Sequence, residues 1–142
     1  MKLAQINIAT AKYPLDGPEL KDFIDNLDRI NGIAEQSEGF VWRLKDDTNN
    51  ATSIQAFENP NTIVNMSVWQ SVDALKQFMF MTDHLSFMKR KGEWFEKSSR
   101  PNYVLWYVED DHIPTLEEAL DKLQLIEQQG PSEAAFDFKK IF

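Results

Sequence analysis

One histidine is the residue best suited to chemistry at neutral pH. His84 lies on a stripe of residues at helical spacing, together with Phe80, Phe87 and Trp94, so we expect a helix with one apolar face. An imidazole there can be a general base, or a ligand for a metal or for haem iron. It can also be a half-buried side chain that is hydrogen-bonded to the backbone or to Asp83. Both interpretations stay open, and we predict His84 as a catalytic residue.

Side-chain amides form the second candidate group. Gln5 and Asn7 alternate along residues 2–9, and Asn65 occupies a similar position in residues 62–69, so each is expected on the inner face of its strand. Amides on a covered sheet need partners, since an unpaired buried polar group costs about 1–3 kcal/mol. They can orient a ligand carbonyl or phenol, or form a cross-strand network that fixes the register. We predict Asn7 as catalytic, and Gln5 and Asn65 as substrate-binding.

Three aromatic residues are candidates for holding a flat substrate. Trp42 and Trp69 fall in expected strands, and Phe78 falls in the expected helix before His84. Aromatic rings can stack on an aromatic ligand, but such residues also build cores and dimer interfaces. We predict Trp42, Trp69 and Phe78 as substrate-binding residues, with the structural role as the alternative.

Several kinds of site are excluded or weakly supported. The chain has no cysteine, which excludes disulfides, iron–sulfur clusters, thiolate nucleophiles and cysteine zinc sites. Its two histidines, His84 and His112, are far apart in the sequence, and the acidic turn at 46–50 lacks the glycine and terminal glutamate of a calcium loop. No nucleotide-binding motif is present. We therefore predict no metal site and, as the first choice, no cofactor, with haem as the alternative.

Charge and hydropathy narrow the choice of partners. Lys and Arg number 15 against 23 Asp and Glu, a net charge of -8, which repels nucleic acid and offers no basic face to an anionic membrane. No apolar run approaches the roughly 18–20 residues needed to cross a bilayer, and no signal-peptide pattern is visible. We expect a cytoplasmic protein whose partners are a small aromatic or hydrophobic molecule and a second copy of itself.

The strands that must position these groups follow from alternating residues. Alternation predicts strands at 2–9, 39–44, 62–69 and 103–108, and a shorter strand at 53–57.

Helices follow from apolar spacing and from capping pairs. We predict one helix from Asp16 to about residue 34, and one at 71–97 that the pair Thr82–Asp83 can interrupt. A last helix runs from Thr115 to Gly130, and Phe136 and Phe138 alternate as in a final edge strand.

This order of elements is typical of an α+β, ferredoxin-like antiparallel sheet with helices on one face. We interpret residues 1–142 as a single domain, with a core at 1–110 and a C-terminal helix and tail at 111–142. The second face of the sheet needs a cover, and we predict that it carries the amides and Trp69. Large bare apolar patches are rare on monomers, so we expect a homodimer that closes this face and leaves a cavity between the two sheets.

Four stretches resemble a known family. Residues Leu3–Ala9, Leu27–Asn31, Gly39–Leu44 and Val64–Ser71 are similar to the family called domain of unknown function 3291. The resemblance covers nearly the whole chain and implies the dimeric α/β barrel superfamily, but it brings no activity.

A more distant resemblance concerns two groups of monooxygenases. Ser67–Ser71, followed by a helix with His84, is similar to the strand–helix passage of antibiotic-biosynthesis and haem-degrading monooxygenases. By position Asn7 matches the asparagine of the haem-degrading group, and His84 matches its iron-ligating histidine. The tryptophan of the haem-degrading group corresponds to a position near Phe78 in this sequence. The phenylalanine there weakens the expectation of haem degradation of that type.

The resulting functional hypothesis is a small-molecule-binding dimeric barrel with monooxygenase-like activity on an aromatic or polyketide-type substrate. The alternatives are a non-catalytic binding or interaction module, or a haem-binding protein.

Overall fold

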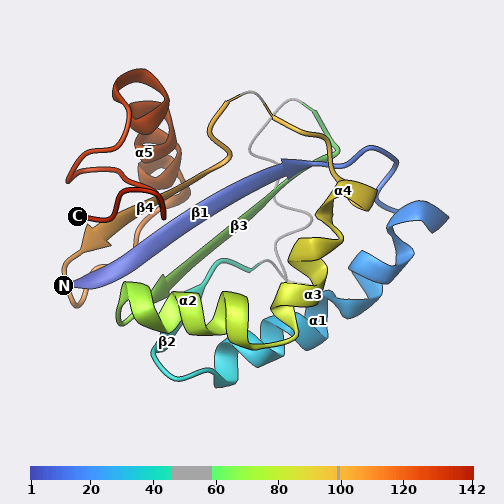
Figure 1. The fold of residues 1–142 in the computed structure, drawn as a ribbon, viewed down its shortest axis with the longest axis horizontal. Coiled ribbons are helices and arrows are strands. Elements are labelled where there is room, and N and C mark those ends of the chain that lie inside the picture. Colours follow the sequence, from blue (N-terminus) through green and yellow to red (C-terminus); the bar gives the residue numbers. More distant parts are fainter. Residues whose placement is uncertain (46–58, 99) are drawn as a thin grey trace.

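A four-stranded antiparallel sheet is the centre of the molecule (Figure 1). The structure is a computed structural model that describes residues 1–45, 59–98 and 100–142. The strands lie in the order β2-β3-β1-β4, with bounds β1 Lys2–Thr10, β2 Phe40–Arg43, β3 Thr62–Trp69 and β4 Tyr103–Val108. The predicted strands at 2–9, 39–44, 62–69 and 103–108 are confirmed, whereas the acidic turn at 46–50 and the strand at 53–57 lie outside the described residues.

The helices begin and end at residues that the sequence marks. Their bounds are α1 Lys21–Gln36, preceded by a 3-10 turn at Pro18–Leu20, then α2 Val72–Met81, α3 His84–Lys89, α4 Lys91–Trp94 and α5 Leu116–Gln129.

Side-chain caps explain two of these starts. The Ser71 side chain accepts a hydrogen bond from the Ala74 amide at the start of α2, and Thr115 accepts one from the Glu118 amide at the start of α5. Gly130, at φ 75°, ends α5. Thr82 is extended, so the predicted interruption after α2 is confirmed.

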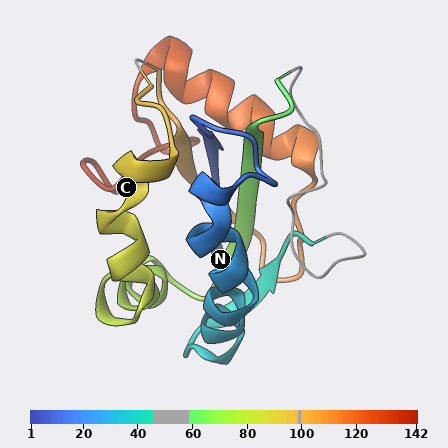
Figure 2. The same ribbon diagram turned by 90° about the vertical axis from the view of Figure 1, so that its right-hand side faces the viewer.

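Both faces of the sheet are covered, each by different helices (Figure 2). Leu3, Trp69 and Leu105 pack against α1 and α2, through residues that include Ala34 and Phe78. The opposite face packs against Ala119, Leu123 and Ile126 of α5, and its members are Ala4, Ile6, Val64, Met66, Val68, Val104, Trp106 and Val108. In Figure 2, α5 lies toward the top of the view, and α1 and α2 lie below it.

One prediction about the faces is wrong. The face with Gln5, Asn7, Asn65 and Trp69 was expected to lie away from the helices, under a second subunit, but α1 and α2 of the same chain cover it. Alternation tells which residues share a face, but not which element covers that face. The apolar core residues of the opposite face needed a dry cover, and α5 provides it.

The C-terminal tail lies along the outer edge of β4. Phe136 and Leu105 exchange two backbone hydrogen bonds of 2.8 Å, and Phe136 is fully buried. This is an isolated bridge, not the predicted edge strand, because tight turns follow on both sides. The bridge protects one edge of the sheet from pairing with another chain.

Candidate functional site

A row of polar side chains crosses the middle of the sheet on the face toward α1 and α2. In the strand register Asn7 of β1 lies opposite Asn65 of β3 and opposite Tyr103 of β4. Asn7 and Asn65 are exposed although both stand on inner strands, and Tyr103 is half-buried. Solvent therefore reaches the sheet at this row.

The row lies between two apolar clusters on the same side of the sheet. One cluster contains Leu3, Trp69 and Phe78, and the other contains Leu20 and Trp94. These clusters hold the helices over both ends of the sheet, so the amides between them stay accessible without loosening the core.

Gln5 fixes the orientation of one of these amides. Its Nε2 donates hydrogen bonds to Asn65 Oδ1 at 2.8 Å and to Ser67 Oγ at 2.7 Å, and Trp69 Nε1 donates to the same Ser67 oxygen at 2.9 Å. Gln5 and Ser67 are 8% and 7% exposed, so the network is rigid. Because the Asn65 oxygen already accepts, its NH2 group is the part left to donate to a ligand.

Aromatic rings connect this network to the histidine. The Trp69 and Phe78 rings stack at 5.2 Å, and the Phe78 ring lies 4.7 Å from the His84 ring. Trp69 is only 1% exposed and Phe78 is also buried, so neither offers a ring face to a ligand in this conformation. Both pack in the core cluster beside Leu3 and Leu105, and their role in binding a substrate stays a prediction.

His84 is the first residue of α3, and its imidazole is held by the backbone. Its Nδ1 lies 3.3 Å from the Met79 carbonyl oxygen, and burial lowers its pKa from the ordinary value of 6.5. A neutral ring that donates from Nδ1 keeps an acceptor lone pair on Nε2. In the described parts of the chain, every fully buried side-chain nitrogen or oxygen has a partner, and none is found for this Nε2, so Nε2 is accessible to solvent.

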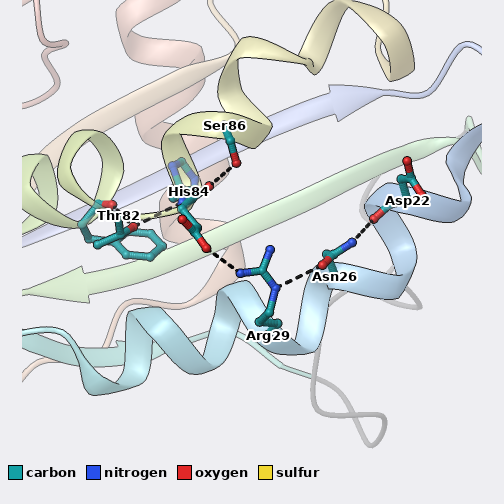
Figure 3. A network of polar contacts seen from close by, with 8 residues as sticks. Asp22, Asn26, Arg29, Thr82, His84 and Ser86 are labelled. Atoms are coloured by element: carbon teal, nitrogen blue, oxygen red, sulfur yellow. Dashed lines mark hydrogen bonds and ion pairs between the residues drawn. The ribbon is translucent and has the colours of Figure 1, made fainter.

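Asp83 is not the partner of His84. Its carboxylate pairs with Arg29 of α1 at 2.8 Å, and Arg29 Nε also donates to Asn26 at 3.1 Å (Figure 3). A second ion pair, between Arg90 and Asp22 at 3.1 Å, joins the other end of α3 to α1. These contacts tie α1 to the segment that carries the imidazole.

Trp42 does not belong to the site. A β-bulge lies between Phe40 and Trp42, so Phe40 faces Trp69 while Trp42 lies opposite Val68. Trp42 packs with the apolar cluster on the α5 side of the sheet. Trp42 therefore lies on the opposite face from the amides, because the extra residue of a bulge reverses the alternation of the residues after it. A role of Trp42 in binding a substrate on that other face stays a prediction.

The structure thus brings together most of the predicted residues and adds others. Gln5, Asn65, Trp69, Phe78 and His84 are linked by direct contacts, and Asn7 is beside them in the register. Neither Tyr103 nor Ser67 is among the predicted site residues. Alternation places Ser67 on the same face of its strand as Asn65, whereas the place of Tyr103 beside Asn7 follows only from the pairing of β4 with β1.

The described residues hold neither a cluster of metal ligands nor a helix that could span a membrane. Within residues 1–45, 59–98 and 100–142, no group of three His, Asp or Glu side chains is close enough to bind one metal ion. In the same ranges, no helix is sufficiently long and apolar to traverse a bilayer.

Comparison with solved structures identifies the fold. A protein of unknown function from Nitrosomonas europaea, NE2512, has 18% sequence identity and a TM-score of 0.51, over 80% of this chain and 95% of that one. SnoaB, a cofactor-independent oxygenase from Streptomyces nogalater, has 16% identity and a TM-score of 0.50 in an asparagine-to-alanine variant, over 80% and 98% of the two chains. At these identities the likeness shows the ferredoxin-like α+β fold alone.

Comparison of sequences identifies the family. The search of curated proteins found no match. The profile of the family described as Domain of unknown function (DUF3291) matches residues 2–142, and the chain therefore belongs to the DUF3291 family.

Proposed function

We propose that this protein binds a small aromatic molecule over the amides of the sheet and acts on it as a cofactor-independent, monooxygenase-like enzyme. One observation carries the proposal. Asn7 and Asn65 are exposed on inner strands of a sheet that is otherwise covered. A series of contacts through Gln5, Ser67, Trp69 and Phe78 connects Asn65 to a histidine with a free Nε2. Amide donors and a neutral base next to apolar walls suit a phenolic or enolic ligand.

Each group has a defined part in such a reaction. His84, whose pKa is lowered by burial, is a neutral base near pH 7 and takes the ligand's acidic proton on Nε2. The NH2 groups of Asn65 and Asn7 donate hydrogen bonds to the oxygen that becomes negative. The resulting electron-rich anion supplies the electrons that reduce dioxygen: a ring carbon forms a C–O bond and loses its hydrogen, the O–O bond breaks, one oxygen atom stays as a new carbonyl, and the other leaves as water, so that the phenol becomes a quinone. Gln5 is a positioning residue, because it holds the Asn65 oxygen.

The fold agrees with this chemistry without requiring it. SnoaB is a cofactor-independent oxygenase of the same fold, which makes the reaction class a reasonable first test. Fold likeness alone does not carry function, so the proposal depends on the site residues.

Oxygen uptake with a panel of polyphenols tests the proposal. We expect uptake by the wild-type chain, a fall of about 10²–10⁴-fold in His84→Ala, and a fall of about 10²–10³-fold in Asn7→Ala. The matched control is His112→Ala, which replaces the exposed histidine of the loop before α5, and it should keep wild-type uptake. No uptake with any polyphenol, or equal uptake by all four proteins, would contradict the proposal.

Haem binding is the second candidate, and one observation favours it. An imidazole that donates from Nδ1 to a backbone carbonyl and leaves Nε2 free has the arrangement of many metal-ligating histidines. His84 would then hold the iron. Titration with haemin distinguishes the candidates: a Soret shift in the wild-type chain that disappears in His84→Ala supports haem, and the absence of a shift argues against it.

The predicted homodimer is also a proposal. Half-buried apolar side chains on the α5 side, among them Ile8, Val41 and Trp42, are candidates for its interface. Light scattering gives the mass in solution. The mass of two chains would support the homodimer. The mass of one chain would contradict it, and the site would then lie between the sheet and the helices of a single chain.

A further inference from the structure

The polar row extends from β3 and β1 onto a third strand, β4, through Tyr103. This tyrosine lies opposite Asn7 in the register, on the face that packs toward α1 and α2. The row therefore runs from Asn65 through Asn7 to Tyr103, across three neighbouring strands. Directly opposite residues in an antiparallel pair have their Cβ atoms about 5 Å apart on one face. The two side chains therefore start side by side, and a ligand that extends from Asn7 toward the outer edge of β4 comes to this phenol.

The C-terminal tail fixes the tyrosine ring. The phenol oxygen accepts a hydrogen bond of 3.1 Å from the Phe138 amide, and the two rings stack at 5.7 Å. The oxygen therefore acts as an acceptor toward the tail and keeps its own hydrogen for another partner. No acceptor for that hydrogen is found among the residues that the structure describes. Burial raises the pKa of Tyr103, so the phenol stays protonated at neutral pH and can donate.

We infer that Tyr103 is a third ligand-binding residue, and that it makes the site selective for ligands with oxygens on opposite sides of an aromatic ring. The inference rests on the proposed function, since it concerns the same ligand. Neighbouring strands lie about 4.8 Å apart at the backbone, and the Phe138 amide of the tail holds the Tyr103 hydroxyl toward the outer edge of β4. The two donor groups are therefore farther apart than the strands, as hydrogen bonds of about 3 Å to oxygens at opposite ends of one ring require. Asn7 donates to one oxygen and Tyr103 to the other, while a ligand with a single oxygen uses the asparagine alone.

A pair of probes that differ in one oxygen tests this selectivity. Para-naphthoquinone has two carbonyl oxygens across one ring, and alpha-tetralone has one carbonyl on a similar bicyclic frame. With both titrations read by tryptophan fluorescence, we expect the wild-type chain to bind the quinone about 10-fold more tightly, as one added hydrogen bond allows. Tyr103→Phe should lose this preference and keep its affinity for the tetralone.

Tyr107→Phe is the matched control. Tyr107 is on the same strand and face, and its hydroxyl donates to the Phe142 carbonyl of the tail at 3.0 Å. It lies opposite Leu3 instead of an asparagine. This variant also loses a bond to the tail, but it should keep the 10-fold preference, which separates a loosened tail from a lost donor.

The outcomes separate the inference from the proposed function. If the wild-type chain binds neither probe, the proposed function fails and the inference fails with it. If it binds both and Tyr103→Phe keeps the preference, the inference alone is overturned. Should Tyr103→Phe not fold, the ring signals of Tyr103 in the wild-type chain decide by NMR. They should shift with the quinone and stay unchanged with the tetralone, and equal shifts would overturn the inference.

Discussion

The two faces of the sheet use the same strands for opposite purposes. Toward α5, every sheet residue of the core is apolar and at most 5% exposed, from Ala4 and Ile6 on β1 to Val108 on β4. Toward α1 and α2, the next residues along β1 are Gln5 and Asn7, which hold a hydrogen-bond network and an exposed amide. The face toward α5 therefore contributes stability, while the face toward α1 and α2 accommodates polar groups that can bind a ligand.

This difference arises from how much of each face the helices cover. Helix α5 packs Ala119, Leu123 and Ile126 against apolar residues of β1, β3 and β4. Over the other face, α1 and α2 contact mainly the end of the sheet that holds Leu3 and Trp69. The middle of that face stays wet, so asparagines there avoid the desolvation that would penalise them in a dry layer.

The largest expected effect on stability comes from substituting one of two adjacent residues of β1, which lie on opposite faces of the sheet. Ile6→Ala removes a fully buried side chain from the α5 face and should lower the free energy of unfolding by about 2–5 kcal/mol. Asn7→Ala, one residue along, should change it by less than about 0.5 kcal/mol and affect ligand binding instead. Urea unfolding of both variants gives the comparison, and a costly Asn7→Ala would show that this amide is structural.

Removing the positioning glutamine should have an intermediate effect. Gln5→Met keeps the volume but deletes the donor to Asn65 and Ser67, so we expect a loss of about 1–2 kcal/mol of unfolding free energy. Ligand affinity should fall as well, because Asn65 is no longer oriented. Stability and affinity that both match the wild type would mean that the network is dispensable.

The pH dependence of stability reports on His84. Its pKa is lower in the folded chain than the ordinary 6.5 because of burial. As the pH falls below about 6.5, the unfolded chain takes up the proton first, so the folded state loses stability down to the folded pKa. Between about pH 7.5 and about pH 5.5, the free energy of unfolding should therefore fall less in His84→Gln than in the wild-type chain. Parallel pH profiles in urea unfolding would contradict the buried, neutral imidazole.

The smallest effect is expected from the contact between α1 and α3. Arg29→Gln breaks the pair with Asp83, in which both side chains are about half exposed or more, so we expect less than about 1 kcal/mol, and less still at high salt. A larger loss in thermal or urea unfolding would mean that this pair carries more of the fold than its exposure implies.

Much of the fold was predictable because its signals are local. Alternation located β3 and β4 to the residue, and Ser71 and Thr115 marked helix starts as capping residues do. The same alternation correctly grouped Gln5 with Asn7 on one face.

The errors have non-local causes. Nothing in the local pattern of β1 says which helices will cover Gln5 or Ile6, since that depends on the path of α5 over a hundred residues later. The bulge that moves Trp42 to the opposite face depends on the pairing of β2 with β3. Likewise the contact of Phe138 with Tyr103 is formed by the tail against β4, and sequence spacing does not reveal it.

The central claim is that the asparagines on the face toward α1 and α2 contact an aromatic ligand. The most direct test is NMR of the side-chain amides while para-naphthoquinone is added. The account predicts that the NH2 signals of Asn7 and Asn65 shift and reach saturation together, while those of Asn26 in α1, whose NH2 group donates to the Asp22 carbonyl, do not move. Saturable shifts elsewhere with Asn7 and Asn65 unchanged would contradict it.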